Sequence, residues 1–387
     1  MKKYYLFFLL IIILFNCSLF DRPERSFEKA STTTIISSTT PTISNFISVW
    51  KTDNTTAGSS NLNQIKLPLN IDGVYNFTVN WGDGQSNIIT KYDDSSTTHT
   101  YQSAGVYTVT ISNVIRGFVF NGTGDRNKII EIKNWGALNL GNSGNYFEGC
   151  NNLTITANNL LDLTWTTNFR FGFANCSSLT TIPQMNKWNV TNITDMSNMF
   201  YESPLFNQDI SNWNVSNVTN MSYMFFNAKT FNQNIGNWTV SNVIDMNSMF
   251  LGASAFNQNI SNWNVSKVLD MSRIFWEAAA FNQNISGWDV SSATNMYGMF
   301  YYTLAFDQDI GSWHISNVTN MTGMFSGVTL SSVNYDSILK GWSLRSVKQN
   351  VTFDAGYSIH GSDISVTNAI SILKDSPNNW IIIDGVP

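Results

Sequence analysis

The chain has 387 residues, a formal net charge of −5, 12% charged residues and 14% aromatic residues. This length favours two or more domains, and the apolar content is enough for a large core. The sequence contains no basic block, which argues against nucleic-acid binding by neutralisation of phosphates.

The first twenty residues, MKKYYLFFLLIIILFNCSLF, begin with two lysines and continue as an apolar run that ends at Phe15. The run is short for a bilayer span and is typical of a secretory signal. Cys17 follows at the position where bacterial lipoproteins carry the acylated cysteine. We predict a signal peptide over residues 1–16 and lipid attachment at Cys17; an ordinary cleaved signal and an uncleaved anchor are the alternatives. Residues 17–43, rich in Ser and Thr, are expected to form a flexible tether.

Residues 44–116 alternate apolar and polar side chains, most clearly in YNFTVNWGDG and GVYTVTISNV, as half-buried strands do. With WGDG at 81–84, HTY at 99–101 and GVYTVTI at 105–111, this segment resembles a PKD domain, an immunoglobulin-like β-sandwich. The resemblance implies a spacer or a minor adhesive unit without catalytic residues. We interpret Asp83 as a turn residue, with metal ligation as the alternative, and His99 as a structural histidine at a strand end.

A 25-residue period governs residues 186–330 and is typical of a solenoid, in which each coil buries its apolar face against its neighbours. The recurring tryptophans are Trp188, Trp213, Trp238, Trp263, Trp288 and Trp313. Methionine recurs from Met196 to Met321 and phenylalanine from Phe200 to Phe325 with the same step. We expect the tryptophans to be buried; an exposed aromatic strip that binds glycan rings is the alternative.

Within one coil, Asp or Asn precedes each first Met, which predicts an N-cap, and the apolar spacing of Met221, Met224 and Phe225 predicts a short helix. In NWNV, Trp213 and Val215 lie two apart and predict a short strand. The Asn-Gln pair that follows each helix is expected to form a ladder of hydrogen bonds between turns. The predicted fold is therefore mainly a leucine-rich-repeat-like solenoid, with a short strand and a short helix per coil, preceded by the small all-β, immunoglobulin-like sandwich.

The repeat FNQDISNWNVSNVTNMSYMF resembles the BspA-type leucine-rich-repeat surface proteins, a bacterial family with 25-residue repeats. The resemblance implies degenerate coils over 117–185, regular repeats over 186–330 and a C-terminal cap over 331–387. It also implies a surface protein with an adhesive role toward a host or extracellular protein or glycan. We expect a location in the cell envelope, lipid-anchored and on the outer surface.

Chemical motifs are scarce. The three histidines lie in different segments, and no HExxH, GxSxG, Gly-rich phosphate loop or Cys-His metal spacing is present. We predict no enzyme activity, no cofactor and no metal. The acidic residues of the repeats, such as Asp195, Asp209 and Asp309, are interpreted as capping or turn residues, with a Ca²⁺ site as the alternative. Cys150 and Cys176 occupy equivalent positions of successive coils; buried thiols are favoured and a disulfide stays possible.

The predicted function is non-catalytic binding by a surface lipoprotein, with a passive envelope protein as the main alternative. If Trp213 and Val215 face inward, strand alternation sends Asn214 outward onto the strand face, which we expect to be concave. The corresponding positions, which we call the strand column, are Asn189, Asn214, Thr239, Asn264, Asp289 and His314. Solenoids commonly bind partners on such a face. The alternative is that these side chains bond one another and contribute to stability alone.

Overall fold

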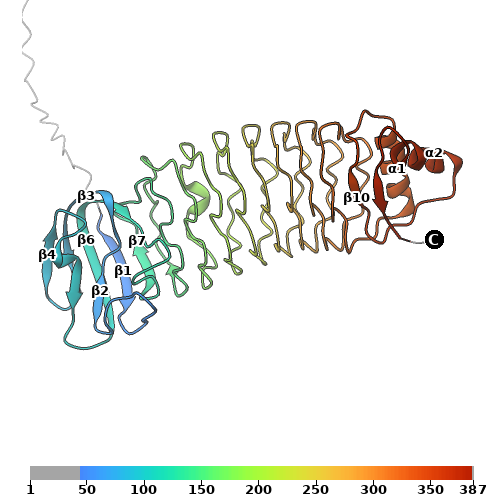
Figure 1. Cartoon of the computed structure of the whole chain (residues 1–387). Helices are drawn as coiled ribbons and strands as arrows, with labels where there is room; N and C mark the ends of the chain where they lie inside the picture. The colour runs from blue at the N-terminus through green and yellow to red at the C-terminus, as the bar shows by residue number, and fades with distance from the viewer. Residues whose placement is uncertain (1–43, 386–387) are drawn as a thin grey trace, which may run out of the picture. The chain divides into compact units, whose positions relative to one another are not determined.

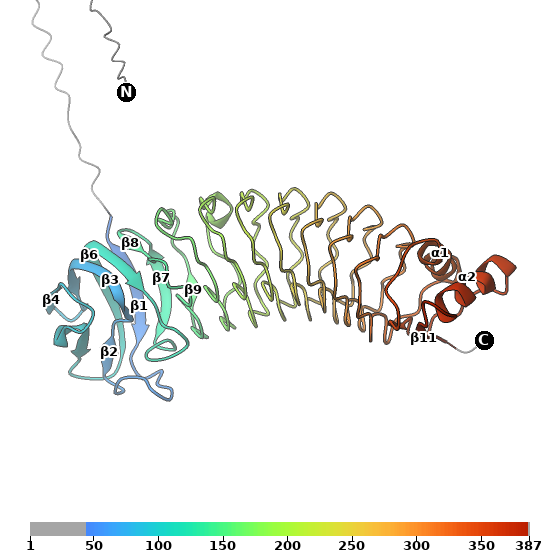
Figure 2. The same cartoon turned by 45° about the horizontal axis from the view of Figure 1, so that its top comes forward.

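The computed structural model describes residues 44–385, so the predicted signal peptide, the tether and Cys17 lie outside the described residues. Figures 1 and 2 show a group of strands at one end, a stack of coils, and two helices at the other end. The elements are β1 (Phe46–Lys51), β2 (Gln64–Lys66), β3 (Leu69–Asn80), β4 (Ser86–Ile89), the 3₁₀ helix η1 (Ser95–Thr97), β5 (Thr98–Thr100), β6 (Val106–Phe118), β7 (Ile129–Asn134), β8 (Leu138–Asn139), β9 (Thr154–Ile155), the 3₁₀ helix η2 (Met185–Lys187), α1 (Ser332–Ser343), β10 (Thr352–Asp354), α2 (Ile364–Lys374) and β11 (Ile381–Ile383).

The main sheet has seven strands in the order β4-β3-β6-β1-β7-β9, with β8 paired to β6. Its first five strands are antiparallel. Tyr75, Phe77 and Val79 alternate along β3 and are buried, because successive side chains of a strand point to opposite faces. A separate antiparallel pair, β2 with β5, covers part of this core and places Ile65 opposite His99.

The sheet changes direction where the repeats begin. β7 is antiparallel to β1 on one side and parallel to β9 on the other, with Ile132 opposite Ile155. From this point each coil pairs with the next in parallel. One hydrophobic core therefore runs without interruption from Phe46 to Trp380.

A buried ion pair joins the β1–β2 connection to the segment before β7. Lys128 is 0% exposed, and its Nζ donates to the carbonyls of Ser60, Asn61 and Gln64 and lies 3.6 Å from Asp125. Burial lowers the pKa of Lys128, and the Asp125 carboxylate opposes that shift. Lys128 therefore ties the end of this connection and the start of β2 to the segment before β7.

The repeats stack in register through one residue per coil. Isolated parallel bridges link Asn168, Asp195, Asn220, Asp245, Asp270, Asn295 and Asn320 in succession. Around them, backbone N–H groups two residues apart donate to the next coil: Met221 to Asp245, Tyr223 to Asn247 and Phe225 to Met249. The Phe column from Phe200 to Phe325 forms a stack in which the ring centroids of neighbouring coils lie 5.2–5.8 Å apart.

The predicted fold class is wrong. The described residues are mainly β, with two α-helices, both C-terminal to the repeats, and the sheets are mixed. No repeat contains the expected helix, and the NWNV segments form no strand. A leucine-rich-repeat-like solenoid with a strand and a helix in each coil is therefore not what this chain forms. Nor do the N-terminal strands close into an independent sandwich, because their sheet continues into β9.

Left-handed residues are the physical reason for the missing helices. In the repeat that begins at Asn220, Tyr223 has φ +57° and Asn227 has φ +52°, and the other repeats carry positive φ at the same two positions. A right-handed helix cannot continue through such residues. The chain instead makes two tight turns, which bring Met221, Met224 and Phe225 to the core as a helical turn would.

The C-terminal segment covers the last coil. Strand β10 pairs in parallel with β11, and Met321 forms a bridge to Phe353. Helix α1 lies within the predicted C-terminal cap, and its Trp342 is buried. Within residues 44–385, no helix combines the length and apolar character needed to cross a membrane.

Candidate functional site

Each residue that forms an inter-coil bridge also closes a turn with its side chain. We call these residues the Asx row: Asp195, Asn220, Asp245, Asp270, Asn295 and Asn320. In each, Oδ1 accepts a hydrogen bond from the backbone N–H two residues later, at 2.8–3.1 Å. This is the bond that an N-cap makes, but here it closes a turn that no helix follows.

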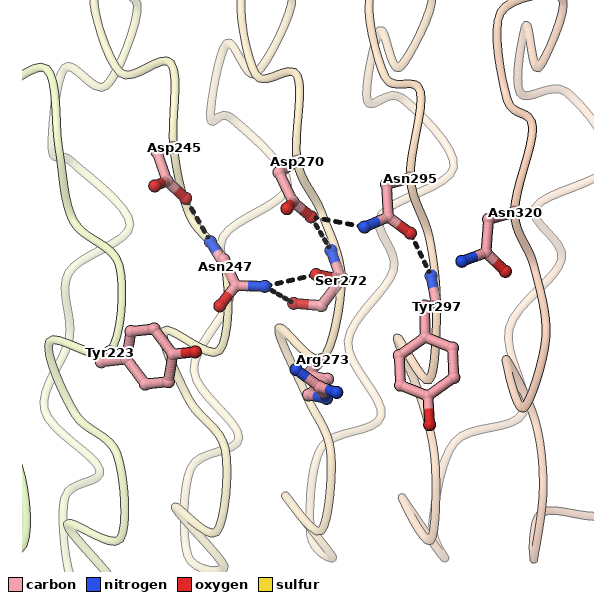
Figure 3. Close-up of a pocket in the computed structure, with 9 residues that line it drawn as sticks. All are labelled: Tyr223, Asp245, Asn247, Asp270, Ser272, Arg273, Asn295, Tyr297 and Asn320. Atoms are coloured by element: carbon pink, nitrogen blue, oxygen red, sulfur yellow. Dashed lines mark hydrogen bonds between the residues drawn. The ribbon is translucent and has the colours of Figure 1, made fainter.

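A shallow polar groove of about 560 Å³ lies along the Asx row, and five successive coils contribute to its lining (Figure 3). Its lining consists of Tyr223, Asp245, Asn247, Asp270, Ser272, Arg273, Asn295, Tyr297 and Asn320. The Asx side chains form one side, and Tyr223, Arg273 and Tyr297 form the opposite side (Figure 3). Amide and carboxylate groups on one side of the groove thus lie opposite the side chains of Tyr223, Arg273 and Tyr297.

The carboxylates of the groove repel one another. Burial raises the pKa of Asp245, and the neighbouring Asp270 and Asp195 raise it further. Asp270 is better satisfied, since its Oδ1 accepts from Ser272 N at 2.8 Å and from Asn295 Nδ2 at 3.3 Å. The groove therefore favours a ligand group that donates hydrogen bonds or carries positive charge.

Beside the groove, aromatic side chains form two groups, one on each side of the coil that contains Asp245, and we call them together the aromatic face: Tyr201, Tyr223 and Phe226, and Trp276, Tyr297 and Tyr301. Trp276 stacks on Tyr301 with centroids 3.8 Å apart, and the Arg273 guanidinium lies 4.8 Å from the Tyr297 ring centroid. Stacked rings held by an arginine lose little conformational freedom on binding, which is favourable for an interface.

Comparison of the repeats with one another separates scaffold from surface. The buried Met and Phe columns keep their residue types, apart from Ile274. By contrast, the position three residues after the Asx row varies freely: Asn198, Tyr223, Ser248, Arg273, Gly298 and Gly323. The position six residues after it carries Tyr201, Phe226, Leu251, Trp276, Tyr301 and Ser326. Stacking of the coils does not require these side chains, so the aromatic face is the best candidate for a binding surface.

The strand column lies elsewhere, and none of its six residues lines the groove. All six are exposed, as alternation with the buried Trp and Val predicts. Asn189, Asn214, Asn264 and Asp289 each accept a bond from the backbone two residues later. For Asp289 the donor residue is Ser291, and its hydrogen bonds, together with the charge of the nearby His314, lower the pKa of the Asp289 carboxyl. The column is thus accessible and also closes turns; whether it binds a partner stays a prediction.

The tryptophan column lies in the interior. Its six indoles are at most 3% exposed, and Nε1 of Trp213, Trp238, Trp263, Trp288 and Trp313 donates to a carbonyl of the preceding coil at 2.8–3.2 Å. Burial is confirmed for these residues. A glycan therefore has no access to the column that the alternative interpretation assigned to it.

The remaining candidate residues have structural roles. Asp83 accepts from Gln85 N and lies 2.8 Å from His99 Nε2; burial opposes ionisation, but these two bonds outweigh it and lower the pKa of Asp83. Cys150 and Cys176 are free and buried, and burial raises the pKa of both thiols. Between residues 44 and 385, no group of three or more His, Cys, Asp or Glu side chains is arranged to hold a metal ion.

The sequence interpretation missed the groove and the aromatic face. It assigned the residues after the Asx row to a helix, which would have scattered Tyr223, Trp276 and Tyr297 around a helical surface. A usable signal was present, because the positions three and six residues after the Asx row change residue type between otherwise similar repeats.

The chain is similar to one family along two overlapping segments. Residues 167–272 and 259–355 both match the family described as "Mycoplasma protein of unknown function, DUF285". No curated protein and no solved structure gives a significant match.

Proposed function

We propose that this chain is a bacterial surface lipoprotein, anchored through Cys17, that binds an extracellular macromolecule and catalyses no reaction. Its resemblance to the BspA-type surface proteins and the apolar run that ends before Cys17 support the location. The partner is a host or extracellular protein, and the aromatic face with the adjoining groove is the binding surface.

One observation carries the proposal: the positions three and six residues after the Asx row, most of them partly exposed, vary while the buried Met and Phe columns stay nearly constant. Tyr, Trp and Arg are the residue types that dominate binding energy at interfaces. Here Arg273, Trp276 and Tyr297 lie within 6.1 Å of one another by their ring and guanidinium centres. The charges of Asp245 and Asp270 favour a partner with basic or hydrogen-bond-donating groups at this point.

The first experiment compares two surfaces of one molecule. In the full-length protein, Arg273, Trp276 and Tyr297 are changed together to Ala, and a second variant changes Asn264, Asp289 and His314 of the strand column to Ala. Binding to immobilised fibronectin, laminin and collagen is measured for both. The first variant should lose binding about tenfold or more, and the second should retain it.

Thermal midpoints decide whether either loss is indirect, and both variants should stay within a few degrees of the parent. Retained binding in the first variant and loss in the second would assign the interface to the strand column. Unchanged binding in both would contradict each surface, and absence of binding by the parent protein would favour a passive envelope role.

Anchoring is tested separately with Cys17→Ser. We expect this variant to lose lipid and to leave the detergent phase or keep its signal peptide. Unchanged mass and unchanged partitioning would contradict attachment at Cys17. Protease accessibility of the parent protein on intact cells tests display on the outer surface.

A further inference from the structure

Trp165 differs from every other tryptophan of this protein. All thirteen tryptophans lie within the described residues; eleven are buried, Trp276 is partly exposed, and Trp165 is 60% exposed. It also lies outside the segments that match the family, just before residue 167. Neither the core nor the proposed interface therefore accounts for it.

The repeat register shows what Trp165 replaces. Asp162 accepts from Thr164 N as Asn189 accepts from Thr191 N, so the two turns are equivalent. The equivalent position of four later turns carries an asparagine whose Nδ2 donates to a carbonyl of the preceding coil: Asn192, Asn217, Asn242 and Asn317. Lys267 and Ser292 occupy it in the other two. At this position the turn that Asp162 closes carries the exposed indole of Trp165 instead of a hydrogen-bonded amide.

Arg116 fixes one face of this indole. Its guanidinium carbon lies 5.0 Å from the Trp165 ring centroid, a cation–π contact. The Nε of Arg116 is buried and has no hydrogen-bond partner in the described chain. Asp162, which lies close enough for Arg116 to lower its pKa, accepts a bond from Asn139 as well as from Thr164; burial opposes the shift. Arg116 thus packs on the ring, while 60% of Trp165 stays exposed to solvent.

Two cavities meet at Trp165. One, of about 370 Å³, is lined by Asn70, Asp72 and Asn142 together with glycine backbone. The other, of about 290 Å³, is lined by Asn113, Asn139 and Asp162. Both cavities are also lined by Arg116 and Trp165, so the indole borders two sets of short polar side chains.

We propose that Trp165 and the two cavities form a binding site for a neutral sugar ring of an oligosaccharide. The C–H groups on one face of a pyranose carry partial positive charge and pack on the electron-rich face of an indole. The ring hydroxyls then bond to amides and carboxylates, which are present on both sides. An acidic sugar fits poorly, because Asp72 and Asp162 outnumber the single guanidinium. This site is independent of the proposed protein interface.

The test uses the full-length protein in detergent with fluorescently labelled cellotriose, maltotriose and chitotriose, and with sialyllactose as the acidic probe. At least one neutral probe should bind, and Trp165→Ala should weaken it about tenfold or more. Trp165→Phe, which keeps an aromatic face, should lose less. Trp276→Ala is the matched control and should leave sugar binding unchanged while weakening binding to matrix protein.

Quenching of tryptophan fluorescence by acrylamide gives a second measurement, which reports the accessibility of Trp165 directly. Most of the readily quenched fluorescence should disappear in Trp165→Phe, and a bound sugar should protect it in the parent. Equal sugar binding by the parent and Trp165→Ala, or binding of none of the neutral probes, would overturn the proposal. Loss of sugar binding in Trp276→Ala would also overturn it, whereas loss of protein binding alone concerns the aromatic face.

Discussion

The N-terminal sheet and the repeat coils bury similar apolar side chains but hold their backbones in different ways. In the sheet, β3 and β6 pair over a long antiparallel stretch, and one irregular loop depends on the unique pair of Lys128 and Asp125. In the coils, regular strands are absent from residues 186–330, and the same few side-chain bonds recur every 25 residues. The difference shows that repeated turns can replace regular secondary structure when each turn forms hydrogen bonds with the equivalent turn of the neighbouring coil.

The side-chain ladder of the coils makes this clear. Asn207 Oδ1 accepts from Asn232 N and from Gln233 Nε2, and Asn232 does the same for Asn257 and Gln258. Asn257 and Asn282 continue the series. The expected Asn-Gln ladder is confirmed. Each rung has several equivalents, whereas the Lys128 pair has none.

The largest effect should come from the core of the coils. Trp238→Ala removes an indole that stacks 6.5 Å from Trp263 and donates to Ile210 O, and we expect a loss of about 3–5 kcal/mol in the free energy of unfolding. Chemical denaturation measures this loss. Because the coils are equivalent, Trp263→Ala should cost nearly the same; a twofold difference would break the equivalence on which the comparison rests.

Lys128→Met should cost nearly as much, about 3–5 kcal/mol, because it leaves the Asp125 carboxylate and three loop carbonyls without their shared donor. Hydrogen exchange should show the loss at residues 60–66 and 125–128 before it appears in the repeats. As a control, Lys133→Met removes a more exposed partner of Glu131 and should have little effect. Uniform loss of protection along the whole chain would contradict a local role for the pair.

A single rung of the ladder should matter less. Asn257→Ala removes the acceptor for Asn282 N and Gln283 Nε2, which we expect to cost about 1–2 kcal/mol. Asn262→Ala, at an exposed position five residues later in the same repeat, is the matched control and should stay within about 0.5 kcal/mol of the parent. Equal effects of the two changes would show that the ladder contributes nothing beyond surface polarity.

The smallest effect is a gain. Asp245 has a pKa raised above its ordinary value of 3.8, so its charge opposes folding once pH exceeds the folded-state pKa. Asp245→Asn, the residue found at this position in other repeats, should therefore raise the thermal midpoint by about 1–2 °C at pH 7. The gain should shrink as pH falls through the raised pKa and disappear below the ordinary value.

Asp289→Asn supplies the opposite sign. Hydrogen bonds from Ser291 and the nearby His314 lower the pKa of Asp289, so its charge favours folding above the ordinary pKa. This variant should gain no stability at pH 7 and should match the parent in acid. A gain of equal size in both variants would show that a general reduction of negative charge, rather than crowding in the groove, is responsible.

The sequence was sufficient for the interior and misleading for the backbone. Burial of the Trp, Met and Phe columns follows from their phase, and the ladder follows from the recurring Asn-Gln pair. The helix was wrong because the spacing of Met221, Met224 and Phe225 and the Asn220 side-chain bond fit two turns as well as a helix. Positive φ at residues such as Tyr223 and Arg273 decides between them, and no side-chain preference announces it. The groove was missed for the same reason, since it exists only when those turns replace the helix.

The hydrogen-bond ladder ends at the C-terminal end of the coil stack, and the way it ends prevents one molecule from stacking on another. Its last acceptor, Asp307 Oδ1, receives bonds from Ser331 N, Ser331 Oγ and Asn334 Nδ2 at the start of α1. If a further repeat turn ended the stack instead of α1, its acceptor side chain and its backbone groups would have no partner. The first repeat turn of a second molecule could then bond to them, because every coil uses the same hydrogen bonds. Such an end is a template for end-to-end growth of fibres. Helix α1 occupies it, so a protein built from self-matching units remains finite in length.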